Sequence, residues 1–389
     1  MKRVVLKKNK QEKFKQGYLL IEKDDIYQKD EISEGELFSV QSVTGDHLGT
    51  FYCGMQNRGF GWKVDDAFIS NLDTSYFINL FEQSKAYRTS LFNATDTNAF
   101  RLYNGEGDGL GGFTIDNYDG HLLVQWYSKG IYQYKFAIIE AIKVVFEHKS
   151  IFEKLRYDKN VATHQLTDGD IEFPIMVLEN NLNYTIDLND GAMTGLFLDQ
   201  RDVRKKLLKL ETKGKDFLNL FAYSGGFSIA AATNGYHTTN VDIANRSIEL
   251  MKQNFAINEL VLDEQKFFTL DAFDALKYFA RHLVTFDAIV IDPPSFSRNK
   301  KKVFSVKDNY HELIEAAVPL VNYNGYLILS TNASNVLLKQ FKTMVEETLK
   351  PLCNYEIESV MGLPKDFKTT DKYKPSKYLK VITVKILSD

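Results

Sequence analysis

The spacing of apolar residues divides the chain into three stretches with different expected structures. Up to about residue 72, apolar and polar side chains alternate around turn residues such as Gly35 and Gly49, which is typical of short antiparallel strands. This stretch is too short for an α/β enzyme fold, so it predicts a small barrel. We expect three domains, over residues 1–72, 73–188 and 189–389.

The middle stretch combines helical and strand patterns. Apolar residues between positions 69 and 88 recur at helical spacing. A glycine-rich turn follows at 105–112, in which we interpret Glu106 and Asp108 as structural residues. A helix is expected around 132–147, and strands are expected near 113–117, 121–126, 151–155, 175–179 and 182–188. This order predicts an α+β domain.

From about residue 197, strands and helices alternate, which predicts a Rossmann-like α/β sheet. Strands are expected at 216–221, up to 242, and at 266–270, 286–291, 325–330, 356–361 and 378–387. Helices are expected at 199–210, from 227, and at 246–258, 272–279, 310–320 and 336–349. The last two strands should form an antiparallel hairpin at the edge of a parallel sheet.

Acidic residues stand at the ends of three strands of this expected sheet. They are Asp242, Asp271 and Asp292, which follow the second, third and fourth strands. Ligands of open α/β sheets bind at the carboxyl ends of the strands, where an acid can hold a ribose or an amino group. Each acid taken alone could instead cap the helix that follows it.

Two turns next to these acids narrow the choice of ligand. The first strand ends in a turn with Gly225 and Gly226 but without the GxGxxG fingerprint of dinucleotide-binding enzymes. Asp292 is followed by Pro293 and Pro294, which make the chain leave the sheet rigidly. A rigid loop beside a cofactor can hold a planar base for in-line transfer. The ordered strand ends therefore favour a methyltransferase that binds S-adenosylmethionine over a nicotinamide dehydrogenase.

Composition limits the kinds of site that the chain can form and the compartment in which it is expected. The chain has two cysteines, Cys53 and Cys353, which exclude a disulfide framework and a CxxC metal site, so no metal is expected. No apolar run approaches the ~18 residues of a membrane span, and we expect a cytoplasmic protein. The net charge of −3 argues mildly against a nucleic-acid binder, but basic clusters occur at 1–15, 298–302 and 365–380.

Four motifs make the chain resemble the class I methyltransferases of large-subunit (23S) ribosomal RNA that carry a PUA domain. They are RLYNGEGDGL at 101–110, TGLFLDQR at 194–201, NLFAYSGGFS at 219–228 and DPPSF at 292–296. Tyr223, where most class I methyltransferases have glycine, is also typical of this family. The resemblance spans essentially the whole chain and implies an N-terminal PUA pseudo-barrel, a central α+β domain and a catalytic Rossmann-like domain.

The resemblance also implies site residues. Gln200 and Arg201 should reach the cofactor. The family pattern further places a set of strand-end residues around S-adenosylmethionine: Phe221, Ala222, Tyr223, Ser224, Gly225, Asp242, Ile243, Asp271, Ala272 and Asp292. Members of the family are often dimers, so a homodimer is a further expectation.

A missing thiol separates two branches of this family. The 5-methylcytosine branch needs a cysteine thiolate that adds to C6 of the base. Where that thiol should stand, this sequence has Ser295 and the run STNAS at 330–334. Guanine N7 has an available lone pair and needs only positioning. Another branch, with asparagine in place of the cysteine, methylates guanine N7, and Asn332 resembles that branch.

We therefore expect methylation of guanine N7 in 23S ribosomal RNA or a large-subunit precursor. Asp292 and Asn332 would orient the base, Phe296 or Tyr310 would stack on it, and the basic clusters would hold phosphates. The alternatives are an exocyclic amine of guanine or adenine, cytosine C5, an RNA-binding ribosome assembly factor with weak or no catalysis, and a small-molecule methyltransferase.

Overall fold

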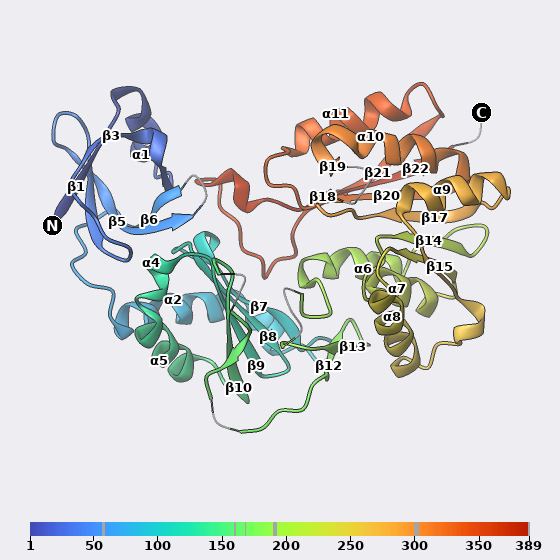
Figure 1. Ribbon diagram of the computed structural model, residues 1–389, viewed down its shortest axis with the longest axis horizontal. Helices are drawn as coiled ribbons and strands as arrows, with labels where there is room; N and C mark the ends of the chain where they lie inside the picture. Colours follow the sequence, from blue (N-terminus) through green and yellow to red (C-terminus); the bar gives the residue numbers. More distant parts are fainter. Residues whose placement is uncertain (57–58, 159–160, 168, 190–192, 299–302, 388–389) are drawn as a thin grey trace. The chain divides into compact units, whose positions relative to one another are not determined.

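The computed structural model describes residues 1–389 except 57–58, 159–160, 168, 190–192, 299–302 and 388–389 (Figure 1). Contacts divide the chain into two compact units. The first comprises residues 1–177, 187–194 and 365–376, and the second comprises 178–186, 195–364 and 377–389. A segment near the C-terminus therefore belongs to the first unit, which sequence spacing did not predict. The predicted domain boundaries at 72/73 and 188/189 remain predictions.

The N-terminal part of the first unit is a six-stranded sheet with the order β2-β6-β5-β4-β1-β3. β1 pairs parallel with β4, and the other neighbours pair antiparallel. Buried Val4, Phe38 and Phe51 belong to its core, and helix α1 (Gln11–Lys15) adds Phe14. The strands are β1 (Lys2–Leu6), β2 (Leu20–Glu22), β3 (Ile26–Lys29), β4 (Leu37–Gln41), β5 (His47–Gln56) and β6 (Gly59–Asp65).

A five-stranded sheet with the order β11-β10-β9-β8-β7 follows in the same unit. Its strands are β7 (Ala99–Asn104), β8 (Phe113–Tyr118), β9 (His121–Trp126), β10 (Ser150–Leu155) and β11 (His164–Gln165). Its helices are α2 (Thr74–Tyr87), α3 (Thr89–Phe92), α4 (Lys129–Tyr132) and α5 (Lys135–Val145). Aromatic residues of α2 and the sheet form one core, because Phe81 packs edge-on against Tyr103 and Phe113.

Buried ionic contacts attach the segment 365–376 to this α+β part. Arg88 is 1% exposed, and its guanidinium donates to both Asp108 carboxylate oxygens at 3.1 and 2.6 Å and to the Asp366 carbonyl. The Asp366 carboxylate accepts from the Arg101 backbone N–H at 2.9 Å. A buried charge is retained only when it is paired and hydrogen-bonded, as Asp108 is here. Asp108 therefore has the structural role expected from the sequence.

The second unit contains a seven-stranded sheet with the order β16-β15-β14-β17-β20-β22-β21 (Figure 1). The first five strands run parallel, and β22 pairs antiparallel with both β20 and β21. The predicted antiparallel hairpin at the sheet edge is thus confirmed. The strands are β14 (Asp216–Leu220), β15 (His237–Asp242), β16 (Lys266–Thr269), β17 (Phe286–Ile291), β20 (Val321–Thr331), β21 (Tyr355–Met361) and β22 (Lys380–Ile386).

Helices cover both faces of this sheet, so its apolar strands are buried (Figure 1). α6 (Arg201–Leu207), α7 (Gly226–Thr233) and α8 (Asn245–Ile257) lie on one face. α9 (Ala272–Arg281), α10 (Val306–Ala317) and α11 (Leu338–Leu349) lie on the other. Two short hairpins complete the fold: β12 (Ile175–Glu179) with β13 (Leu182–Ile186), and β18 (Phe296–Arg298) with β19 (Val303–Ser305).

Candidate functional site

The carboxyl ends of the parallel strands bring the predicted site residues to one edge of the sheet. β14 pairs with β15 and β17, and β17 pairs with β20, all in parallel register. The residues at or just after the ends of these strands, among them Phe221, Asp242, Asp292 and Asn332, therefore share one edge. This is where open α/β sheets bind ligands.

The loop after β14 has an unusual backbone. Phe221, Tyr223 and Gly225 have φ values of +60°, +49° and +81°. A left-handed conformation costs an ordinary residue roughly 1–2 kcal/mol, and such strain concentrates at functional sites. Contacts hold Tyr223 in this conformation, because its hydroxyl accepts from the Gly195 N–H at 3.0 Å and its ring centroid lies 5.4 Å from that of Phe197.

Asp242 connects this loop to the next strand. Its Oδ2 accepts from the Tyr223 N–H and its Oδ1 from the Ala244 N–H, both at 2.9 Å. Each carboxylate oxygen has a second lone pair, which suits the hydroxyls of the ribose predicted to bind there. The next residue, Ile243, is 63% exposed and presents an apolar surface beside the carboxylate.

Asp271 caps helix α9 and also faces a cavity. Its Oδ1 accepts from the Phe273 N–H at 3.0 Å, so the capping interpretation is correct. It also lines a cavity of about 550 Å³, together with Phe221, Phe273, Asp274, Lys277, Ser297, Phe304, Glu312, Glu315 and Ala316. Four carboxylates and one ammonium make this cavity suited to an amino group and unsuited to a phosphate.

Asp292 is held by two polar side chains. Gln200 Nε2 donates to Asp292 Oδ2 at 3.1 Å and to Ser330 Oγ at 2.8 Å. Desolvation raises the pKa of Asp292 to about 6, partly offset by its hydrogen bond to Ser330, while the charge of Asp199 raises the pKa further. A carboxyl group with a raised pKa at a strand end is typical of functional sites. The sequence analysis named Ser330 only as a position without a cysteine and did not predict this hydrogen bond.

Arg201, predicted to reach the cofactor, is 5% exposed. Its carbonyl accepts from Asn180 Nδ2 at 3.3 Å. One helical turn on, buried Arg204 forms an ion pair with buried Glu179 at 2.6 Å. It also donates to the Phe197 carbonyl at 2.8 Å, which fixes the segment that carries Gln200. Nothing in the spacing of the sequence indicated this pair, because its members lie on separate elements.

Asn332 and Phe296 are available for an acceptor base, whereas Tyr310 is not. Asn332 is exposed, and its Oδ1 accepts from Ser295 Oγ at 2.5 Å. Phe296, on β18, is 64% exposed. Tyr310 is completely buried, and its hydroxyl bonds to the Ile291 and Ser330 carbonyls at 2.8 and 2.9 Å. The expectation that Tyr310 stacks on a base is therefore wrong, because it lies on the buried face of α10.

The basic clusters are only partly available to a nucleic acid. Lys380 is 4% exposed, and its Nζ donates to the Ala333 and Val336 carbonyls at 2.6 and 2.8 Å. Its predicted role in phosphate binding is wrong, and burial lowers the pKa of its ammonium to about 8. Lys13 pairs with Asp25 at 2.8 Å. Residues 299–302 of the second cluster lie outside the described residues.

Neither cysteine can supply a nucleophile at this edge. Cys53 is fully buried, and desolvation raises the pKa of its thiol to about 11. Cys353 is half-buried and precedes β21. In the register of the sheet, Tyr355 pairs with Ile386 at one end and Met361 with Val381 at the other, where β22 meets Ser330. Cys353 is therefore at the end of the sheet opposite the site.

The edge has groups that match S-adenosylmethionine. Gln200 Oε1 is buried and has no hydrogen-bond partner among the described residues, so an N–H donor such as the cofactor's amino group would satisfy it. The carboxylate of Asp242 suits ribose hydroxyls, and the acidic cavity beside Asp271 suits the adenine amino group. No group of three or more His, Cys, Asp or Glu residues in the described parts of the chain could hold a metal ion.

Throughout the described ranges, no helix is both long and apolar enough to cross a membrane.

Two family models match the sequence: the S-adenosylmethionine-dependent methyltransferases over residues 137–381, and the PUA-like domain over residues 4–65. The PUA-like unit expected from the sequence is thus confirmed.

Similar proteins agree with these matches. A Bacillus subtilis (strain 168) protein with the provisional name ribosomal RNA large subunit methyltransferase YwbD is 41% identical over 98% of this chain and 99% of its own. Ribosomal RNA large subunit methyltransferase I of Pseudoalteromonas translucida is 31% identical over 76% of each chain. The crystal structure of SMU.776, provisionally described as a methyltransferase and complexed with SAH, has a TM-score of 0.93 and 38% identity, covering 99% of this chain and 100% of that one. The chain belongs to the family of S-adenosylmethionine-dependent methyltransferases.

Proposed function

We propose that this protein methylates N7 of a guanine in 23S ribosomal RNA, as the free RNA or within a large-subunit precursor. The names of the relatives support an RNA of the large ribosomal subunit as substrate. The PUA-like domain supports the same class of substrate. The observation that carries the choice of N7 is chemical: no thiolate is available at the edge of the sheet, where Ser295 and Asn332 stand.

The absence of a thiolate favours guanine N7 over cytosine C5. Carbon C5 of cytosine becomes nucleophilic only after a thiolate adds to C6. Cys53 and Cys353 are the only cysteines of the chain, and neither can do this. Guanine N7 needs no covalent activation, so positioning suffices.

The proposed mechanism assigns each group a physical task. When bound, S-adenosylmethionine supplies an electrophilic methyl group on a positively charged sulfur. The N7 lone pair forms the new C–N bond as the C–S bond breaks, and the positive charge passes from the sulfur to the guanine ring. The ionised carboxylate of Asp292 stabilises this charge from a fixed position, because Gln200 and Ser330 hold it.

Asn332 and Phe296 orient the base in this proposal. Ser295 fixes the Asn332 amide through Oδ1, so the other end of this exposed amide is the Nδ2 donor. That donor would bind guanine O6, the acceptor next to N7 on the major-groove edge. The exposed ring of Phe296 would stack on the base, which must leave its helix if the target is paired.

A cysteine-free enzyme tests the proposal. The Cys53→Ala/Cys353→Ala double variant is incubated with S-adenosylmethionine and transcribed 23S RNA, and the digested nucleosides are identified by mass spectrometry. We expect 7-methylguanosine at the wild-type yield. Formation of 5-methylcytidine by the wild type, with loss in the double variant, would establish the cytosine alternative. If the wild type binds RNA but does not bind S-adenosylmethionine at millimolar concentration, it acts as an assembly factor.

A further inference from the structure

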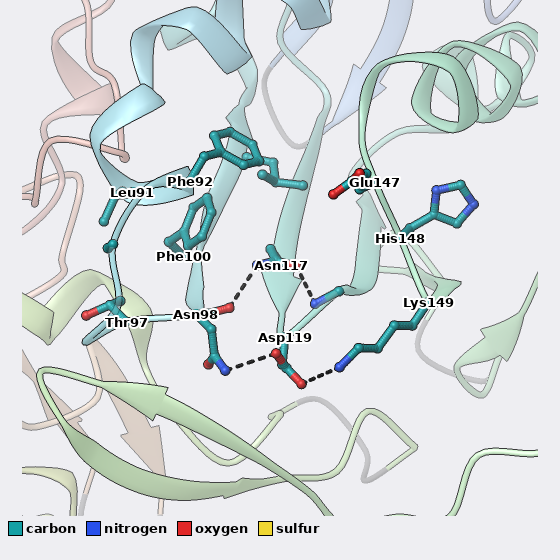
Figure 2. A pocket seen from close by; sticks show the side chains of 13 residues that line it. Leu91, Phe92, Thr97, Asn98, Phe100, Asn117, Asp119, Glu147, His148 and Lys149 are labelled. Atoms are coloured by element: carbon teal, nitrogen blue, oxygen red, sulfur yellow. Dashed lines mark hydrogen bonds and ion pairs between the residues drawn. The ribbon is translucent and has the colours of Figure 1, made fainter.

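A second cavity lies in the α+β part of the first unit and plays no part in the site described above. It has a volume of about 550 Å³, within the ~300–1,000 Å³ typical of small-molecule sites. Figure 2 shows four segments that converge on it: α3, the first residues of β7, the turn between β8 and β9, and the loop before β10. One side of the cavity is aromatic and the other is polar.

The aromatic side is rigid and partly open to solvent. Phe92 is 39% exposed and packs edge-on against Phe100 at 5.3 Å between ring centroids. Buried Phe146 lies parallel to it at 6.4 Å. Lys85 Nζ lies 5.8 Å from the centre of the Phe92 ring and donates to the Val145 carbonyl at 2.7 Å. An exposed ring held by three neighbours is a preorganised stacking platform.

Most of the polar side is already paired. Asp119 accepts from Asn98 Nδ2 at 3.0 Å and from Lys149 Nζ at 2.5 Å. Asn117 Nδ2 donates to the Asn98 carbonyl, and Asn117 Oδ1 accepts from the Gly120 N–H, both at 2.8 Å (Figure 2). These bonds fix the shape of the turn and neutralise Asp119. Thr97, a further polar residue of the lining, is buried, so recognition falls to two polar residues that are at least partly exposed.

Those residues are Glu147 and His148, and both present acceptors. The Nδ1 of His148 lies 2.9 Å from the Phe146 carbonyl, so Nδ1 carries a proton and donates to that oxygen, and in the tautomer with this single proton Nε2 is an acceptor. Glu147 is exposed and forms no hydrogen bond or ion pair among the described residues. With Asp119 paired to Lys149, Glu147 gives the cavity a net negative charge, which disfavours a phosphate and favours N–H donors.

We propose that this cavity binds an unpaired RNA base whose edge carries N–H donors, stacked on Phe92 and held by Glu147 and His148. Single-stranded RNA is recognised in this way, by stacking on aromatic side chains and by hydrogen bonds to base edges. The proposal rests on the proposed function, because it assigns a second contact to the RNA substrate. The bound base is not the methyl acceptor, because the cavity has none of the cofactor-binding residues.

Substitutions in the full-length protein test this assignment. Phe92→Ala and His148→Ala are compared with Phe136→Ala, a matched control that removes a ring 82% exposed on α5 of the same unit. Affinity for transcribed 23S RNA is measured without cofactor, and S-adenosylmethionine affinity is measured separately. We expect Phe92→Ala to weaken RNA binding by about 5- to 100-fold, the range for loss of one stacked base. His148→Ala should weaken binding without touching the aromatic packing, and Phe136→Ala should not.

The outcomes distinguish failure of the cavity assignment from failure of the proposed function. Unchanged RNA affinity in both cavity variants would overturn the assignment, even if the wild type methylates the RNA. Cavity-dependent binding by a wild type that forms no 7-methylguanosine would instead contradict the proposed function and leave the assignment intact. A short single-stranded RNA with one 2-aminopurine gives a direct signal, because its fluorescence should change when the wild type binds it and should not change with Phe92→Ala.

Discussion

Replacing Asp292 with asparagine is expected to stabilise the fold at pH 8 while it impairs methyl transfer. Burial raises the pKa of Asp292 to about 6 from its ordinary 3.8. An acid with a raised pKa costs folding free energy when it is ionised. The cost is absent below pH 3.8, develops between 3.8 and 6, and is complete above 6. A neutral amide of similar shape avoids this cost.

The size of the effect follows from the pKa difference. At ~1.4 kcal/mol per pH unit, the difference between 3.8 and about 6 gives an upper limit of ~3 kcal/mol. Asp292 is partly exposed, so solvent screening reduces the expected gain to about 1–2 kcal/mol. Asparagine can still accept from Gln200 Nε2, so this hydrogen bond is preserved. Loss of the negative charge should reduce the methylation rate by about 10²-fold.

Urea unfolding at pH 8 and at pH 4.5 measures the predicted gain. The Asp292→Asn variant should be more stable than the wild type at pH 8, and the difference should shrink at pH 4.5. Asp263→Asn, a substitution of an exposed acid in the same unit, is the control and should show no such pH dependence. A variant destabilised at pH 8, or an equal change at both pH values, would refute the account of Asp292.

Three further substitutions test other parts of the site. Ser330→Ala removes a hydrogen bond that lowers the pKa of Asp292, so the acidic limb of the pH–rate profile should move to higher pH, and Ser330→Thr should restore it. Phe296→Ala should raise the KM for RNA several-fold and leave calorimetric S-adenosylmethionine affinity unchanged; an unchanged KM would exclude stacking. Arg204→Ala leaves Glu179 buried without its partner, so urea unfolding should show a loss of ~3–5 kcal/mol, and a loss below ~1 kcal/mol would contradict the buried pair.

Long apolar patterns predicted the second unit well. The expected strand at 286–291 coincides with β17, because the apolar run at 288–291 leads directly into Asp292-Pro-Pro, where the chain must leave the sheet. The strand ends Asp242 and Asp271 followed from the same alternation of strands and helices. In these segments, the apolar pattern of the sequence matches the residues that are buried in the structure.

The features that were missed depend on contacts between distant residues. Helical spacing placed Tyr310 on α10 but could not show that its face is buried. Lys380 falls within the strand expected at 378–387, but the lysine-rich run gave no sign that its side chain is buried. The β18–β19 hairpin is too short to have a clear period. Arg88 binds the Asp366 carbonyl across 278 positions, which no local pattern encodes.

Nucleoside analysis of 23S ribosomal RNA directly tests whether this protein methylates guanine N7. RNA from wild-type cells, from cells lacking this protein, and from the deletion strain expressing Asp292→Asn is digested and quantified by mass spectrometry. We expect one 7-methylguanosine to be lost in the deletion, to return with the wild-type gene, and to return weakly or not at all with the variant. Unchanged 7-methylguanosine at every site, or the loss of 5-methylcytidine in its place, would contradict this expectation.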